Sequence, residues 1–169
     1  MKHLQYPIGR FHAPESYSDS LLHGWITDLE NFPLVLQKAL ATLRPRQLDL
    51  PYRPGGWTRR QVVHHLCDSH MNGFLRHKHT LASEDPVILP YPEALFSEMA
   101  DSKNFPVEPA LLLLQGLHAK WAALVKNLPA NAWLRTYRHP QYNRQYTLRE
   151  SLGNYVWHGK HHIAHLLLP

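Results

Sequence analysis

The sequence has little cysteine and no long apolar segment. Cys67 is the only cysteine among 169 residues, which excludes an intramolecular disulfide and a metal site built from neighbouring thiolates. The longest apolar runs, PALLLL and HLLLP, are far shorter than the roughly 20 residues that span a bilayer, and the N-terminal segment lacks the apolar core of a signal peptide. We therefore expect a cytoplasmic protein with no membrane partner, folded as one domain over residues 1–169.

Clustered positive charge is also missing. The formal net charge of +5 raises nucleic acid as a partner, but the Lys and Arg residues are scattered and form no basic stripe interleaved with aromatic residues. Internal repeats are absent, and so is the HExxH motif, in which a glutamate beside the zinc ligands acts as a general base. We expect no nucleic-acid partner, and the sequence identifies no catalytic general base.

Histidine, by contrast, is abundant, with 14 copies against 13 acidic residues. Four of the histidines fall within the nine-residue segment WHGKHHIAH. On a helix that turns about 100° per residue, these four side chains share an arc of about 100° that borders a separate apolar stripe. They are His158, His161, His162 and His165. This arc should face the interior of a helix bundle or a cleft beside it.

Four segments of helical periodicity predict a helix bundle. They cover residues 18–43, 58–82, 110–128 and the chain from residue 147 onward. The segments TRRQ and TLRE, which begin at Thr58 and Thr147, have the signature of capping boxes at the start of two of these helices. Residues 85–109 form a Pro-containing connection with at most a short helix around 93–100, and alternating Tyr and Arg in residues 129–146 suggest a small β-hairpin. The fold class is therefore all-α: a four-helix bundle with long connections and a hairpin before the last helix.

Two histidine-rich helices in one small bundle favour a metal site. His158 and His162 are four residues apart, so both imidazoles can reach one metal at about 2.0 to 2.1 Å. The segment HHLCDSH lies on the second helix, where His65 falls in a polar row with Ser69, Asn72 and Arg76. His64 points about 100° away from that row, so His65 is the better candidate for a third ligand.

Simpler interpretations of these histidines remain. A histidine pair with a spacing of four residues is often exposed or held by hydrogen bonds in the core. His64 and Asp68 have the spacing of a surface pair on a helix. His118, on the third helix, is more typical of a core histidine with satisfied hydrogen bonds than of a metal ligand.

The succession YPIGRF, LDLPYRPGGWTRRQVVHHLCDSHMN, LHAKW and LGNYVWHGKHHIAH resembles the YfiT branch of the DinB superfamily, bacterial proteins described as metal-dependent hydrolases. The resemblance runs nearly from end to end. It implies a DinB-like four-helix bundle, a homodimer and one divalent metal per chain held by three histidines. The ligands it implies are His65, His158 and His162, with His161 and His165 as supporting or pocket residues.

Three neutral imidazoles leave a fourth position for water, whose pKa a divalent cation lowers. Zinc suits such a site and is the expected ion, with nickel as the alternative. The function that follows is hydrolysis of a small-molecule substrate. The wider superfamily implies an alternative, a thiol transferase in which the metal holds a low-molecular-weight thiol; a metal-binding dimeric protein without turnover is the third hypothesis. Because the ordinary histidine pKa is about 6.5, protons should displace the ion by about pH 5.

Overall fold

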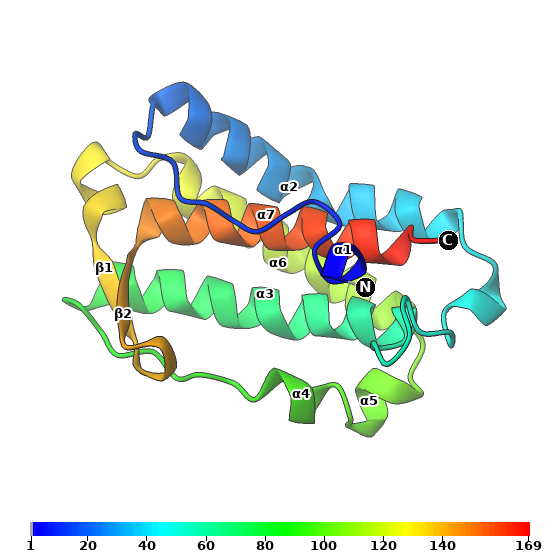
Figure 1. Cartoon of the computed structure of the whole chain (residues 1–169). Helices are drawn as coiled ribbons and strands as arrows, with labels where there is room; N and C mark the ends of the chain where they lie inside the picture. The colour runs from blue at the N-terminus through cyan, green and yellow to red at the C-terminus, as the bar shows by residue number, and fades with distance from the viewer. Residues whose placement is uncertain (1) are drawn as a thin grey trace.

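The computed structural model describes residues 2–169, in which four long helices form a bundle with a two-stranded sheet at one end (Figure 1). The long helices are α2 (Asp19–Ala41), α3 (Arg59–Ala82), α6 (Glu108–Lys126) and α7 (Leu148–Leu166). The shorter elements are α1 (Lys2–Gln5), η1 (Pro45–Gln47), α4 (Glu93–Phe96), α5 (Ala100–Lys103), η2 (Ala130–Leu134), β1 (Thr136–His139), η3 (Pro140–Tyr142) and β2 (Arg144–Thr147). The expected bundle and hairpin are confirmed. None of the helices in residues 2–169 is long and apolar enough to cross a membrane.

Side-chain caps fix where α3 and α7 begin. At the start of α3, the Thr58 hydroxyl accepts from the Gln61 amide at 3.2 Å, and the Gln61 side chain accepts from the Thr58 amide at 2.9 Å, so the predicted capping box forms. At the start of α7, the Thr147 hydroxyl accepts from the Glu150 amide at 3.2 Å. The Glu150 side chain pairs with Arg144 instead of reaching back to Thr147, so only half of the second predicted capping box exists.

Helices α2 and α3 each pack against both α6 and α7, which closes the bundle. The apolar core has two parts, one around Leu29, Trp121 and Leu152 and the other around Leu36, Leu66 and Leu114. Glycine allows α3 and α7 to approach closely: a Cβ atom on Gly73 would lie 2.5 Å from the Tyr155 ring. A larger residue at this position would push Tyr155 out of place.

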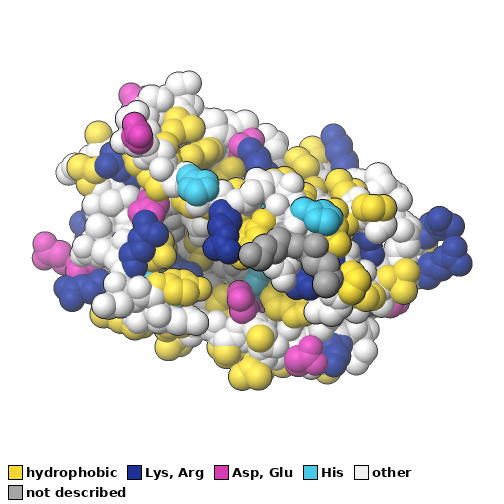
Figure 2. Space-filling model, viewed as in Figure 1, with side chains coloured by type: hydrophobic (Ala, Val, Ile, Leu, Met, Phe, Trp, Pro, Cys, Tyr) yellow, Lys and Arg dark blue, Asp and Glu magenta, His cyan; other side chains and the backbone are white. Residues whose placement is uncertain are grey.

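The connections form a layer beside α3. The expected short helix at residues 93–100 is two one-turn helices, α4 and α5, which run alongside α3 (Figure 1). The hairpin pairs β1 with β2 in antiparallel register, with Tyr137 opposite Tyr146. Lys and Arg side chains are spread over the face seen in Figure 2 and do not gather into one basic patch, in keeping with their scattering along the sequence.

Candidate metal centre

Three histidines from two helices converge inside the bundle. His65 lies on α3 and His158 and His162 lie on α7, and their ligand nitrogens are all within 4.8 Å of one another. The two Nε2 atoms of His65 and His158 are 3.1 Å apart. In a tetrahedral zinc site with bonds of 2.0 to 2.1 Å, two ligand nitrogens lie about 3.3 Å apart. The spacing of this pair therefore fits the separation that one zinc ion requires.

A series of hydrogen bonds determines which nitrogen of His158 carries the proton. The Leu29 carbonyl can only accept, so His118 Nδ1–H donates to it at 2.6 Å. His118 Nε2 then accepts from His70 Nδ1–H at 2.8 Å, and His70 Nε2 accepts from His158 Nδ1–H at 3.2 Å. We call this series the His158 chain. It leaves the His158 Nε2 lone pair directed at His65 and available to a metal.

His162 is oriented in the same way by a shorter series. The Gln5 carbonyl accepts from His165 Nε2–H at 3.2 Å, which leaves His165 Nδ1 as an acceptor for His162 Nδ1–H at 3.3 Å. The Tyr91 hydroxyl lies 3.2 Å from His65 Nδ1 and can accept from it. All three imidazoles can therefore present an unprotonated Nε2 to one point, which is the donor set that zinc or nickel prefers.

Burial keeps the three imidazoles neutral. Desolvation, with a smaller contribution from His165, lowers the pKa of His65 to about 4. Desolvation lowers the pKa of His158 and of His162 well below the ordinary histidine value, and the neighbouring histidines add to the effect. A metal ion binds neutral imidazole, so the folded chain has these ligands ready without the loss of a proton at neutral pH.

Replacing His118 with phenylalanine should weaken zinc binding roughly 10- to 100-fold, although His118 is too far along the His158 chain to be a ligand. In this variant the His70 Nδ1–H has no acceptor, so the His70 proton can move to the Nε2 atom of His70. His70 Nε2 then no longer accepts from His158 Nδ1–H, and the proton of His158 is no longer held on Nδ1. Competition with a zinc chelator measures the affinity.

The matched control for this variant is His77→Phe. Both histidines are 0% exposed, but His77 is bonded to Ser151 and Trp121 and to no metal ligand. Equal zinc affinity in the two variants would show that the His158 chain does not support the site.

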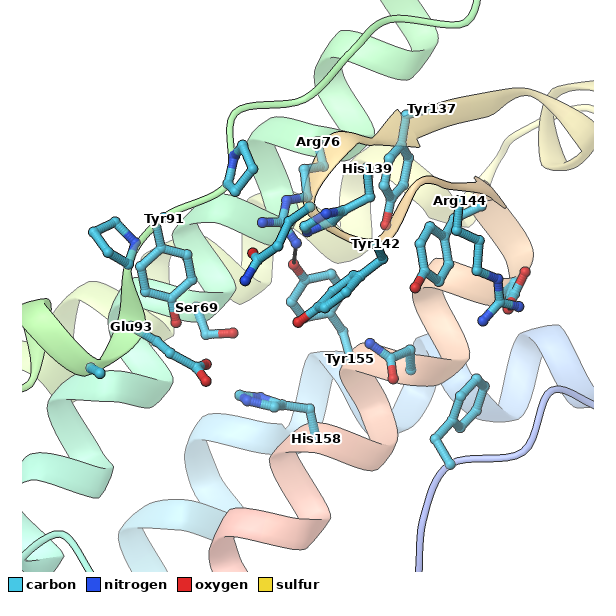
Figure 3. A pocket seen from close by; sticks show the side chains of 18 residues that line it. Ser69, Arg76, Tyr91, Glu93, Tyr137, His139, Tyr142, Arg144, Tyr155 and His158 are labelled. Carbon is cyan, nitrogen blue, oxygen red and sulfur yellow. Dashed lines mark hydrogen bonds and ion pairs between the residues drawn. The ribbon is translucent and has the colours of Figure 1, made fainter.

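A cavity of about 840 Å³ opens beside the cluster, with His158 at its wall. Its lining comes from α3, the connection before α4, the hairpin and α7, and is rich in tyrosine (Figure 3). The Glu93 carboxylate extends from α4 toward His158, and Arg76 lies at the hairpin end (Figure 3). The candidate metal centre thus has access to a pocket of the size that holds a small organic molecule.

The other histidines singled out in the sequence have different surroundings. His64 is buried and donates from Nε2 to the Phe105 carbonyl at 3.2 Å, so it does not form the surface pair with Asp68. His161 stacks on Trp157 with ring centroids 4.6 Å apart and makes no hydrogen bond to the three converging histidines. His118 is satisfied in the core, as expected, but it also supports His158 through His70.

Sequence reasoning missed His70, Tyr91 and Glu93. His70 lies within the segment HHLCDSH, but it is five residues from His65. Residues on one face of a helix are three or four apart, so this spacing did not place the two histidines together. Tyr91 and Glu93 belong to the connection between α3 and α6, whose path over α3 no periodicity could predict.

The fold and the site together define a helical bundle with a candidate three-histidine metal centre, and comparison with known proteins gives the family of this bundle. The DinB superfamily family model matches residues 29–166. The chain is 47% identical over 163 residues to "Putative metal-dependent hydrolase YfiT" of Bacillus subtilis, covering 96% of this chain and 92% of that protein. It is 42% identical over 166 residues to a Bacillus cereus protein of the same description, covering 98% of this chain and 95% of the relative.

A solved structure of Bacillus subtilis YfiT, described as "a probable metal-dependent hydrolase with an unusual four-helix bundle topology", superposes with a TM-score of 0.95 at 47% identity. The match covers 97% of this chain and 94% of the other. The chain belongs to the DinB superfamily, and the relatives named above carry the description "putative" or "probable metal-dependent hydrolase".

Proposed function

We propose that this protein is a metal-dependent hydrolase of small molecules in which His65, His158 and His162 hold one divalent ion, with zinc expected and nickel as the alternative. The observation that carries the proposal is the convergence of three neutral imidazoles whose hydrogen bonds direct Nε2 toward one point. When bound, the ion would supply a Lewis acid that lowers the pKa of a water and polarises a substrate carbonyl.

The chain itself supplies the pocket and a candidate proton acceptor. Two carboxylates line the cavity, Glu93 and Glu150, and Glu150 is paired with Arg144. Glu93 takes part in none of the ion pairs formed within residues 2–169, and its side chain extends toward His158 (Figure 3). We assign to Glu93 the role of accepting a proton from the attacking water, in place of the HExxH glutamate that the sequence lacks.

The test is a screen of the zinc-loaded protein against panels of esters and amides. Hydrolysis should stop when the metal is removed by chelation, and Glu93→Gln should lower kcat by roughly 10²- to 10⁴-fold without loss of zinc. Glu84→Gln, at an exposed position outside the pocket, is the control and should retain full activity. Activity that persists in the chelated protein would contradict the proposal.

A thiol transferase with the same ligands is the second candidate, and the size of the pocket favours it. A cavity of about 840 Å³ is large enough for a low-molecular-weight thiol and an electrophile together. In this case millimolar thiol should add to chlorinated or epoxide substrates only when metal is present. Zinc binding with turnover in neither assay would leave a non-catalytic metal-binding protein.

We further propose a homodimer in the cytoplasm. The dimer is implied by the family resemblance, and light scattering should give twice the mass of one chain. The location is supported by the lack of any cysteine besides Cys67.

A further inference from the structure

Arg76 is a basic side chain of the metal pocket with unused hydrogen-bonding capacity. It lies on α3, and its Nη1 donates to the Tyr155 hydroxyl at 2.9 Å. The Tyr155 ring is itself held against Gly73, where no side chain would fit. The guanidinium is therefore fixed in place at the hairpin end of the cavity (Figure 3).

No carboxylate of the described residues neutralises Arg76. None of the ion pairs within residues 2–169 includes it, and its Nε atom is buried without a hydrogen-bond partner. Arg144, which lines the same cavity, is paired with Glu150. Among the described residues the Arg76 side chain donates only from Nη1 to Tyr155, so the remaining N–H groups at the outer end of the guanidinium can donate to an acceptor that enters the cavity.

A second buried polar atom lies next to Arg76. His139 is 5% exposed, and its Nδ1 atom is buried without a partner. Figure 3 shows the His139 ring beside Arg76 at the wall of the pocket. The side chains of Arg76 on α3 and His139 on β1 thus line one end of a cavity whose other end is His158.

We propose that Arg76 binds a carboxylate of the substrate, so that the protein acts on small organic anions. The inference rests on the proposed function, because the same pocket must hold the reacting bond next to the metal centre. Arg76 contacts Tyr155, which precedes His158 by one turn of α7, or about 5 Å of rise. The proposed carboxylate site therefore lies toward the N-terminal end of α7 from His158, within the same cavity.

The charges of the pocket favour a monoanion. Arg144 and Glu150 neutralise each other, and Glu93 lies at the His158 end of the cavity, so Arg76 is the unpaired charge of the described residues at the hairpin end. One positive charge balances one carboxylate, and its planar fork of N–H groups matches the two carboxylate oxygens. The surrounding tyrosines provide apolar ring surface for the rest of the substrate.

Benzoate and its uncharged analogue benzamide test this by calorimetric titration of the metal-free and the zinc-loaded protein. We expect both forms of the wild type to bind benzoate at least tenfold more tightly than benzamide. Arg76→Gln should lower benzoate affinity roughly 10- to 100-fold, to the level of benzamide, without a change in zinc content. Arg76→Lys should retain part of the benzoate affinity, and Arg46→Gln, at an exposed position outside the pocket, is the control and should stay within twofold of the wild type.

The outcomes separate this inference from the metal proposal. If the protein takes up no zinc when zinc is added but still binds benzoate through Arg76, the anion site is supported and the proposed function is overturned. Benzoate that binds only the zinc-loaded protein, with equal affinity in Arg76→Gln, would place the carboxylate on the metal and overturn the anion site. Absence of benzoate binding at millimolar concentration in both forms would also overturn it.

Discussion

Replacing His162 with alanine should reduce bound zinc from one ion per chain to almost none after gel filtration. Two of the three converging nitrogens remain in this variant, and they cannot enclose an ion as the three do. The loss should exceed the roughly 10- to 100-fold effect of removing a supporting residue, because a direct bond to the metal disappears. Elemental analysis of protein purified without chelator measures the stoichiometry.

His161→Ala is the matched control for the zinc stoichiometry. His161 is a buried histidine on the same helix, next to His162, but it stacks on Trp157 and stands outside the cluster. Its variant should retain one zinc ion per chain. Equal zinc in His162→Ala and the wild type would exclude His162 from the ligand set.

Added zinc should raise the free energy of unfolding by about 2.7 kcal/mol when the free ion is a hundredfold above Kd. This increment should be similar at pH 8 and pH 5 and should begin to fall only near pH 4. The ordinary histidine pKa of 6.5 alone predicted its loss by about pH 5. Burial changes this expectation, because the pKa of His65 is lowered to about 4 and those of His158 and His162 lie well below 6.5. The folded site is therefore still neutral at pH 5.

The metal-free protein should lose stability in a different pH window. Below pH 6.5 the unfolded chain takes up protons at these histidines, whereas in the folded chain the pKa of His65 is about 4 and the pKa values of His158 and His162 lie well below the ordinary value. The free energy of unfolding therefore falls as the pH drops through this window, by about 1.4 kcal/mol per pH unit for each such histidine. Stability from this source is fully present above pH 6.5.

Thermal unfolding from pH 8 to pH 4, with and without zinc, separates the two effects. In His65→Ala the zinc increment should be small at every pH. A zinc increment that is lost between pH 7 and pH 5 would show that the ligands titrate near their ordinary pKa. An increment that is unchanged in His65→Ala would mean that the ion binds elsewhere.

The sequence predicted the helices well because their periodicity and caps are local. Thr58 and Gln61 cap α3 as their spacing predicts, and the α7 segment places His158 and His162 one turn apart on one face. Helical projection also placed Ser69 and Arg76 in line with His65, and both line the cavity that His158 borders. These features depend only on the 3.6-residue repeat of a helix.

The supporting residues could not be predicted, because they depend on how distant elements meet. His118 and Leu29 lie on α6 and α2, and their link to His158 requires the packing of all four long helices. Glu93 comes from a connection without periodicity. The second capping box is incomplete for a similar reason. The Glu150 side chain forms an ion pair with Arg144 of the hairpin, and the position of the hairpin depends on tertiary structure.

The His158 chain has a consequence for proton transport. A row of imidazoles can conduct a proton only if its last member can pass the proton on, and this row ends on the Leu29 carbonyl, which has no proton to give and cannot release one to solvent. Moving the proton of one imidazole to its other nitrogen would require the same change in all three imidazoles. His118 would then have no N–H to donate to the Leu29 carbonyl. The His158 chain is thus a dead end for protons, and the open pocket, on the side where Glu93 lies, offers a way out to solvent.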